Sequence, residues 1–255
     1  MKYAAIAEKA AREAGELVRK YQGKEKGIHF KAERDIATIA DKKSEELLRK
    51  ILIEDNFPEH DFLSEESEFR DAKSEYRWIV DPVDGTGNFA HENPLWGISV
   101  GLMHKGEMVA GAVCLPTLDE MFIAEKGKGA FLNGKKIGAS SQSEFYDLLL
   151  CVEMAPNEEM IRKTLLLEKS LALKHRVRTL GSAAMDLAFL ACGRFDVFIS
   201  AYLYIWDVAA AICIIGEAGG ICSRLDGSRI DPLRMSFDFA ASNGILHRQL
   251  IEKLQ

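Results

Sequence analysis

The sequence predicts an α+β / α/β fold in which helices and an antiparallel sheet come first and a layered α/β unit follows. Three features of the sequence predict it. Residues 1–21 place apolar side chains on one face of a helix. Residues 61–134 contain short β-type runs that Gly, Asn and charged turn residues separate, as in antiparallel hairpins. After the polar stretch 138–146, strand-like and helical patterns alternate, which favours a sheet covered by helices.

Helices and short strands are expected in the first half of the chain. The first helix is expected to end near Gly23, a residue type common at helix C-caps, and a charged mobile loop follows it. A second helix is expected from about Asp41, with Pro58 beyond its end. The strands are expected at residues 61–64, 77–81, 97–104, 107–115, 120–126 and 129–134.

The second half of the chain is expected to form its own unit. The linker-like stretch 138–146 predicts one domain at residues 1–140 and another at residues 141–255. Strands are expected at residues 148–153, 177–180, 195–200, 220–223 and 239–242. Helices are expected at residues 157–173, 182–192 and 207–217 and from about residue 245.

The composition excludes several classes of function. The chain has 255 residues and a net charge of −6, so no nucleic-acid partner is indicated. No apolar run approaches the ~18 residues of a membrane span, and the N-terminus lacks the continuous apolar core of a signal peptide. The five cysteines contain no C-x-x-C pair, which argues against a zinc site or a disulfide framework. Reduced thiols in a cytoplasmic protein are expected instead.

The segment IVDPVDGTGNF, residues 79–89, brings two carboxylates together directly after an apolar run. In a continuous strand, Asp81 and Asp84 would point to opposite faces. Pro82 and Gly85 favour a turn at the strand end, which would aim both carboxylates at one point. Hard oxygen ligands suit Mg²⁺ or Mn²⁺. The alternative is a plain surface turn, since Asp, Pro and Gly are common in turns.

The run Gly85-Thr86-Gly87-Asn88 is a candidate phosphate cradle, because a helical turn opening here would offer free backbone N–H groups. It is not a Walker A loop, which requires G-x-x-x-x-G-K-[ST]. It is also not an EF-hand, because Val83 and Gly85 stand where that loop needs oxygen side chains.

Other carboxylates follow or begin expected elements. Glu65 and Glu66 come directly after a short strand, although a solvated acidic loop would look the same. Asp207 stands where an N-cap belongs, ahead of an apolar helix, and Asp41 has a similar position at the second helix. Simple helix capping is the alternative for both.

Taken together, these segments resemble the inositol monophosphatase family of magnesium-dependent, lithium-sensitive phosphatases. The matching segments are FKAERDIATIAD (30–41), FLSEES (62–67), WIVDPVDGTGNFAH (78–91), EKGKGAFLNGKKI (125–137), LGSAAMDLAFLACGRFDVF (180–198) and WDVAAAICIIGEAGG (206–220). The resemblance implies the layered α-β-α-β-α sandwich of the inositol monophosphatase / fructose-1,6-bisphosphatase type. It also implies a homodimer and inhibition by lithium.

The resemblance further implies two to three Mg²⁺ ions, with Mn²⁺ as a substitute. Glu65, Asp81 and the carbonyl of Val83 would hold the first ion. Asp81, Asp84 and Asp207 would hold the second, and Glu65 would help to hold a third, looser one.

The resemblance assigns the remaining roles around a phosphate ester. Asp41 and Thr86 would orient the attacking water, and with Glu65 they form the expected catalytic group. The backbone N–H groups of Gly85 and Thr86 would bind the phosphate, and Lys31 would belong to a mobile loop near the site. The expected substrate-binding residues are Gly85, Thr86, Gly181, Ser182, Ala183, Ser200 and Asp207.

The expected function is that of a Mg²⁺-dependent phosphomonoesterase acting on inositol monophosphate or a related polyol or sugar phosphate through metal-activated water. The physiological substrate stays open, because Ser200 stands where relatives that favour inositol phosphate carry a glutamate. Fructose-1,6-bisphosphate and 3′-phosphoadenosine 5′-phosphate are alternative substrates. A non-catalytic regulatory protein of the same fold is the alternative outside enzymology.

Overall fold

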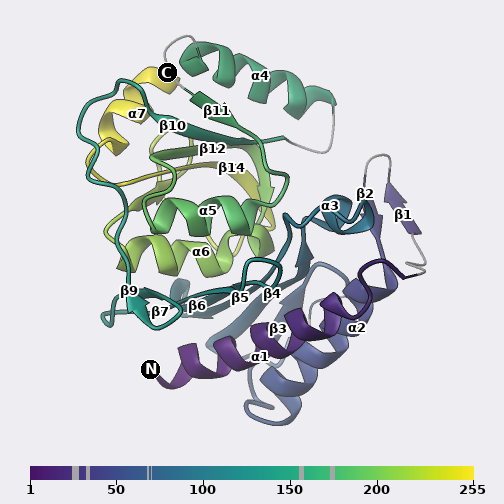
Figure 1. Ribbon diagram of the computed structural model, residues 1–255. Coiled ribbons are helices and arrows are strands. Elements are labelled where there is room, and N and C mark those ends of the chain that lie inside the picture. Colours follow the sequence, from purple (N-terminus) through teal and green to yellow (C-terminus); the bar gives the residue numbers. More distant parts are fainter. Residues whose placement is uncertain (25–28, 33–34, 68, 70, 155–157, 173–175) are drawn as a thin grey trace.

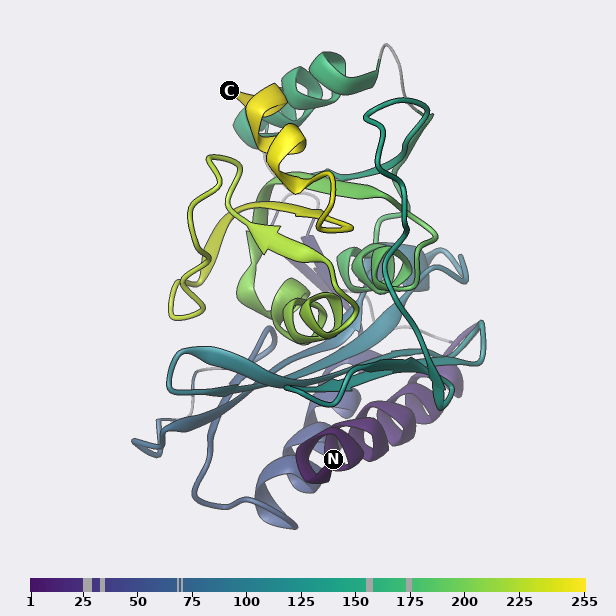
Figure 2. The same cartoon turned by 90° about the vertical axis from the view of Figure 1, so that its left-hand side faces the viewer.

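The computed structural model describes residues 1–24, 29–32, 35–67, 69, 71–154, 158–172 and 176–255. Helices and sheets alternate in five layers, and Figures 1 and 2 show them from two sides. One pair of helices covers the outer face of the first sheet, a second pair lies between the sheets, and a third covers the outer face of the second sheet. The predicted α-β-α-β-α sandwich is therefore confirmed.

The first sheet has seven strands that follow one another in chain order. They are β3 (Asp61–Ser64), β4 (Tyr76–Asp84), β5 (Gly97–His104), β6 (Glu107–Leu115), β7 (Glu120–Glu125), β8 (Ala130–Leu132) and β9 (Lys135–Lys136). All neighbouring strands are antiparallel except β3 and β4, which are parallel. The parallel pair differs from the predicted run of hairpins, and it makes the end of β3 lie beside the end of β4.

Two helices cover the outer face of this sheet. Helix α1 (Lys2–Arg19) packs on β5 and β6 and against α2 (Ile39–Arg49), which a short π-helical turn, η1 (Lys50–Glu54), extends. The buried face of α1 is built almost entirely of alanine, whose small side chain allows the helix to lie close to the strands. The large side chains beneath it come from the sheet, with Trp78 and Ile98 fully buried.

The second sheet has five strands in the order β11-β10-β12-β14-β13. Its strands are β10 (Leu149–Glu153), β11 (Arg176–Arg178), β12 (Val197–Tyr204), β13 (Ile221–Ser223) and β14 (Ser236–Ser242), and its helices are α4 (Glu158–Ala172), α5 (Ala183–Ala191), α6 (Ile205–Glu217) and α7 (His247–Leu254). Strand β10 is parallel to β11 and β12, and the other pairs are antiparallel. The predicted domain boundary falls in the segment between β9 and β10.

Helix α6 lies directly on the first sheet, at the point where two strands carry glycine. A Cβ at Gly111 would come within 2.3 Å of the carbonyl oxygen of Ala210, and one at Gly101 within 2.8 Å of Ala209. The side chain of Ser99 on β5 also donates a hydrogen bond to the carbonyl of Trp206, at 3.3 Å. These contacts fix the N-terminus of α6, and with it Asp207, against the end of β4.

The structure differs from the sequence prediction near the N-terminus. The first helix ends at Arg19 instead of Gly23. The expected loop contains an antiparallel pair, β1 (His29–Ala32) and β2 (Asp35–Ala37). Alternation of apolar and polar residues is too brief in such short strands to stand out in the sequence. None of the described helices is both long enough and apolar enough to cross a membrane.

Candidate metal centre

A β-bulge in β4 makes Asp81 and Asp84 converge. Asp81 pairs with Ser99 and Asp84 pairs with Gly97, so three steps along β4 match two steps along β5. The extra residue cancels the alternation that would send the two carboxylates to opposite faces. The predicted convergence is thus present, but the predicted turn at the strand end was wrong. Strand β4 runs through Asp84, and Gly85 then ends it with a φ of +87°.

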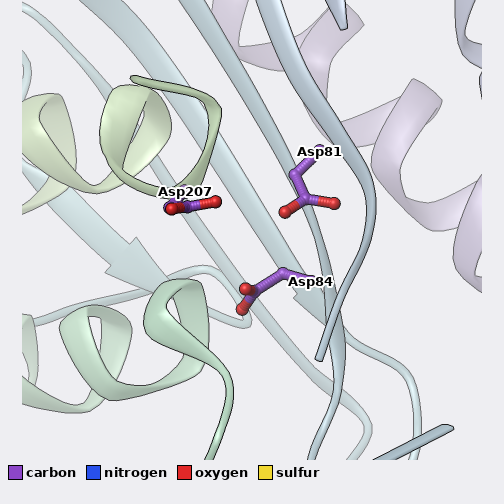
Figure 3. Close-up of side chains that lie close together, drawn as sticks. All are labelled: Asp81, Asp84 and Asp207. Carbon is purple, nitrogen blue, oxygen red and sulfur yellow. The ribbon is translucent and has the colours of Figure 1, made fainter. Parts of the chain in front are cut away.

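Asp207 completes a cluster of three carboxylates. Asp81, Asp84 and Asp207 each offer one oxygen atom, and these atoms lie within 4.8 Å of one another. Figure 3 shows the two β4 side chains and the α6 side chain around one space. Asp81 and Asp84 are buried and Asp207 is partly buried. Carboxylates at this spacing fit a hard divalent cation, whose usual ligands in proteins are oxygen atoms.

Helix N-termini hold two of these carboxylates in place. The Ser182 hydroxyl donates a hydrogen bond to Oδ2 of Asp84, and the backbone N–H of Ala184 donates another to the same atom at 2.8 Å. Oδ2 of Asp207 accepts the N–H of Tyr204 at 2.8 Å. Asp207 is therefore the third residue of α6 in a capping box, not the N-cap that its position suggested.

Asp41 is positioned in the same way on α2. Its Oδ2 accepts the backbone N–H of Thr38 at 2.7 Å and the Thr38 hydroxyl at 2.5 Å. Its Oδ1 accepts the hydroxyl of Thr86 at 2.9 Å, and the same hydroxyl lies 2.9 Å from the carbonyl oxygen of Val83. The two residues expected to orient water are therefore in direct contact.

Glu65 lies near the cluster because of the parallel pairing of β3 and β4. Ser64 pairs with Val80, so the next residues on the two strands, Glu65 and Asp81, follow side by side. The negative charge of Glu65 contributes to the raised pKa of both Asp81 and Asp207.

Burial and mutual repulsion of the carboxylates in the cluster favour a bound cation. Burial, followed by the charges of Glu65 and Asp84, holds the pKa of Asp81 well above its usual value. Burial and the charge of Asp84 likewise raise the pKa of Asp207. Burial raises the pKa of Asp84 to about 6, although the hydrogen bonds from Ser182 and α5 oppose the rise. A divalent cation among these oxygens would relieve the repulsion, so the residues fit the expected metal.

The predicted phosphate cradle does open a helical turn. Gly85 caps α3 (Thr86–Ala90), and its left-handed conformation suits glycine. The side chain of Asn88, for which the sequence predicted no contact, donates from Nδ2 to the carbonyls of Leu95 at 2.6 Å and Leu180 at 2.8 Å. This amide ties the cradle to the segment that leads into α5.

A pocket of about 130 Å³ opens beside the carboxylates on the α5 side. Its lining residues are Asp84, Glu153, Met154, Gly181, Ala183, Tyr202, Leu203, Tyr204 and Asp207. Of the expected substrate-binding residues, Gly181, Ala183 and Asp207 line it. Ser182 is buried behind it and holds Asp84.

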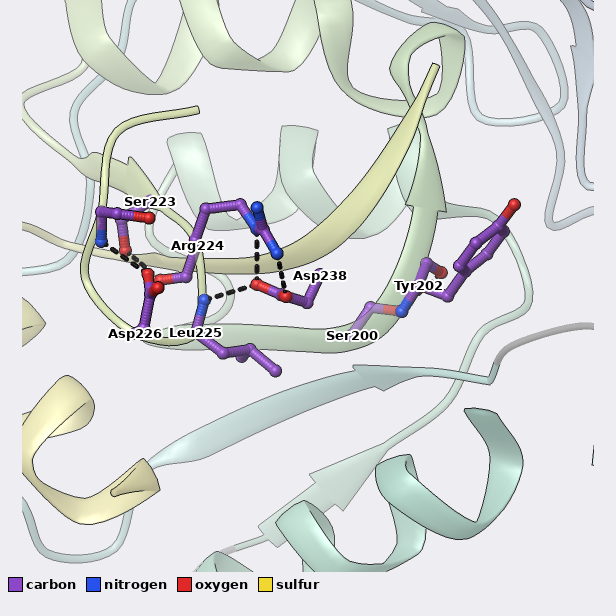
Figure 4. A network of polar contacts seen from close by, with 8 residues as sticks. Ser200, Tyr202, Ser223, Arg224, Leu225, Asp226 and Asp238 are labelled. Atoms are coloured by element: carbon purple, nitrogen blue, oxygen red, sulfur yellow. Dashed lines mark hydrogen bonds and ion pairs between the residues drawn. The ribbon is translucent and has the colours of Figure 1, made fainter. Parts of the chain in front are cut away.

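Ser200 is fully buried, and its hydroxyl donates to the carbonyl of Tyr202 at 3.0 Å. Figure 4 shows Ser200 and Tyr202 on β12. It also shows the ion pair between Arg224 and Asp238, of which Asp238 lies on the neighbouring strand β14. Lys31 falls in strand β1 instead of a loop, and its side chain lies outside the described part of the structure.

Sequence reasoning missed several residues that build the site. Thr38 and Ser44 are small polar residues whose hydroxyls bond to the site. The Thr38 hydroxyl donates to the carboxylate of Asp41, and the Ser44 hydroxyl donates to the carbonyl of Pro82 at 2.7 Å. Single serines and threonines carry no distinctive signal. Glu153 could have been found, because a carboxylate at the end of an apolar strand is the feature that drew attention to Asp81.

Comparison with known proteins extends over the whole chain. The model of the Inositol monophosphatase family matches residues 1–255. Inositol monophosphatase 1 of Solanum lycopersicum is 38% identical over 258 residues, which cover 98% of this chain and 93% of that protein. Inositol monophosphatase 1 of Mus musculus is 34% identical, with 99% and 92% covered. The crystal structure of the extragenic suppressor protein suhB of Bartonella henselae has a TM-score of 0.93 at 31% identity, with 100% and 99% covered.

Sequence similarity and geometry lead to the same conclusion. The family match spans residues 1–255, and the carboxylates that converge come from the segments that carried the resemblance. The chain therefore belongs to the inositol monophosphatase family of phosphomonoesterases.

Proposed function

We propose that the protein hydrolyses inositol monophosphate or a related polyol or sugar phosphate with the help of Mg²⁺. The convergence of Asp81, Asp84 and Asp207 within 4.8 Å carries this proposal. Carboxylate oxygens are the ligands that Mg²⁺ and Mn²⁺ prefer. The similarity to inositol monophosphatases along the full chain supports the substrate class.

The residues that would hold the ions surround one space. Asp81, Asp84 and Asp207 would supply most of the oxygens, with Glu65 and the carbonyl of Val83 beside them. This set would serve two to three Mg²⁺ ions, with Mn²⁺ as a substitute. When bound, such ions neutralise the charge of a phosphate ester and lower the pKa of a water molecule.

Asp41 and Thr86 would orient the attacking water. A hydroxyl has one proton and two lone pairs, so Thr86 can donate to Oδ1 of Asp41 while it accepts a hydrogen bond from a water. Oδ2 of Asp41 is already occupied by Thr38, which fixes the carboxylate plane. Oδ1 is thus the atom that would receive a proton from that water through the Thr86 hydroxyl.

The phosphate and its leaving group would bind in two different places beside the carboxylate cluster. The N–H groups of Gly85 and Thr86 would bind phosphate oxygens. The pocket beside Gly181 and Ala183 would receive the polyol or sugar, because it directly adjoins Asp84 and Asp207. We further propose a homodimer, from family likeness, and a cytoplasmic location, which suits five free cysteines.

A panel of phosphate esters tests the proposal. Phosphate release is measured with Mg²⁺ for inositol 1-phosphate, glycerol 2-phosphate, fructose 1,6-bisphosphate and 3′-phosphoadenosine 5′-phosphate, and again after chelation. Release from the polyol monophosphates that stops on chelation supports the proposal. Faster release from a bisphosphate would overturn the assignment of a polyol monophosphate as the substrate. No release from any ester would overturn the proposed function as a whole.

A further inference from the structure

Glu153 is a carboxylate of the pocket that no proposed role uses. It ends β10 and pairs in register with Ser200 on β12, so the two side chains lie next to each other on the same face of the sheet. Cys151, two residues earlier on that face, belongs to the core beneath α5. Glu153 therefore points toward α5 and forms part of the pocket wall with Asp84 and Asp207.

The carboxyl group of Glu153 has a buried counterpart. Oε2 of Glu153 and both carboxyl oxygens of Asp186 are buried, and no fixed donor of the described residues bonds to them. Asp186 lies in the first turn of α5 and is fully buried. Each carboxyl group shifts the pKa of the other, so Glu153 and Asp186 lie near each other in the protein interior. A proton shared between the two carboxyl groups would satisfy Oε2 and fix the orientation of the Glu153 side chain.

The electrostatics support a pair that holds a proton. Burial, followed by the charge of Asp186, keeps the pKa of Glu153 well above its usual value. Burial raises the pKa of Asp186 to about 8, with the Cys151 thiol and the Glu153 carboxyl opposing the rise. Because Oε2 is buried, Oε1 is the carboxyl oxygen left for a ligand. It already accepts the N–H of Met154 at 3.2 Å, and a carboxyl oxygen has a second lone pair.

We propose that Glu153 determines substrate specificity by accepting a hydrogen bond from a hydroxyl of the leaving group, and that Asp186 positions it. The inference rests on the proposed function, because it presumes that a phosphate ester places its leaving group in this pocket. Ser200, the residue that the sequence suggested for this contact, is fully buried and bonded to Tyr202. The acceptor thus comes from the neighbouring strand, at the paired position.

Two substrates separate recognition of a hydroxyl from hydrolysis in general. Inositol 1-phosphate has hydroxyls on its leaving group, and phenyl phosphate has none. Glu153→Ala is expected to lower kcat/KM for inositol 1-phosphate by about tenfold to a hundredfold, mainly through KM, as for a lost hydrogen bond to a charged group. Its kcat/KM for phenyl phosphate is expected to fall at least about fivefold less, so the ratio of the two kcat/KM values drops. Glu158→Gln, which changes an exposed carboxylate, is the matched control.

The positioning role of Asp186 has its own pair of variants. Asp186→Asn can still donate a hydrogen bond to Glu153 and is expected to keep KM for inositol 1-phosphate within about threefold. Asp186→Ala removes the contact and is expected to raise that KM about as much as Glu153→Ala. Equal effects of the two Asp186 variants on KM would overturn the positioning role.

Binding without turnover provides an independent readout. Free inositol is titrated into protein that holds Mg²⁺ and inorganic phosphate, and Glu153→Ala is expected to weaken inositol binding but not phosphate binding. Circular dichroism and Tm establish that each variant is folded, and Glu153→Leu, which also lacks an acceptor, replaces Glu153→Ala if the latter unfolds. Unchanged specificity in a folded variant would overturn the inference and leave the proposed function intact. Failure of the unmodified protein to hydrolyse either ester would overturn both.

Discussion

The hydroxyl of Ser182 donates a hydrogen bond to Oδ2 of Asp84, and this contact joins the N-terminus of α5 to the bulge of β4. The N–H of Ala184 reaches the same oxygen at 2.8 Å. The partial positive charge of a helix N-terminus stabilises a carboxylate there. Asp84 therefore depends on a helix from the second half of the chain for its orientation and part of its ionisation.

Ser182→Ala is expected to weaken Mg²⁺ binding several-fold and to cost about 1–2 kcal/mol of stability, because it removes both the N-cap of α5 and a donor to Asp84. Calorimetric titration with Mg²⁺ and urea unfolding measure the two effects. Ser143→Ala, at an exposed serine of the linker, is the control. Unchanged Mg²⁺ affinity in Ser182→Ala would show that Asp84 needs no support from α5.

The layered fold was predictable because its strands and helices are long enough to show their periodicity. Strands β5 and β6 have the predicted bounds, and α5 differs by one residue at each end. Strands β1 and β2 have four and three residues, too few for a pattern, and their segment was expected to be a loop. The parallel pairing of β3 with β4 was also missed, since a strand's sequence does not record the direction of its neighbour.

Asp84→Asn is expected to abolish most hydrolysis while the protein stays folded. Asparagine keeps an oxygen acceptor for Ser182 and Ala184 but loses the negative charge that a cation requires. The expected fall in kcat is about a thousandfold or more, in line with the loss of a group that supports charge stabilisation at a reaction centre. Phosphate release and circular dichroism measure activity and folding. Near-normal turnover in this variant would contradict the mechanism.

The stability of the metal-free protein should fall as the pH rises. Asp84 has a folded-state pKa of about 6 against 3.8 for the free side chain, and the pKa values of Asp81 and Asp207 are raised as well. Between pH 3.8 and about 6, folded Asp84 holds its proton while the unfolded side chain has lost it. The contribution of this group to the free energy of unfolding is therefore fully present below pH 3.8 and is lost as the pH rises past about 6. For Asp84 the loss is about 3 kcal/mol.

Mg²⁺ should reverse this loss, because it binds the folded, deprotonated cluster and not the unfolded chain. The increase in Tm on adding Mg²⁺ is therefore expected to be larger at pH 8 than at pH 5. Thermal unfolding at both pH values, with chelator and with Mg²⁺, measures it. In Asp84→Asn, the metal-free protein is expected to lose less stability over this range. An equal Tm increase at the two pH values would argue against a metal bound by this cluster.

Thr86→Ala is expected to lower kcat by about a hundredfold without weakening Mg²⁺ binding, because it removes the hydroxyl beside Asp41 that would orient water. Thr86→Ser keeps the hydroxyl and is expected to keep kcat within about tenfold. Steady-state kinetics and a Mg²⁺ titration separate the two effects. Equal activity of the alanine and serine variants would show that the Thr86 hydroxyl does not orient the water.

The candidate site was predictable where several carboxylates recur in recognisable segments. Asp81, Asp84 and Asp207 do converge, although a bulge and not a turn brings the first two together. The contacts of Asn88 and Glu153 were not predictable, since each depends on which backbone lies across from it in the folded chain. Residue type alone does not say that Asn88 meets the carbonyl of Leu180 or that Glu153 pairs with Ser200.

Gly85→Ala is expected to destabilise the protein and to reduce activity more than Gly87→Ala. A Cβ at Gly85 would come within 2.9 Å of the carbonyl of Leu95, and its φ of +87° disfavours any other residue, whereas Gly87 has open space and an ordinary helical backbone. The strain is expected to cost about 1–3 kcal/mol and to displace Thr86 from Asp41. Urea unfolding and kcat of both variants test this, and a fully active Gly85→Ala would show that the cradle tolerates another backbone conformation.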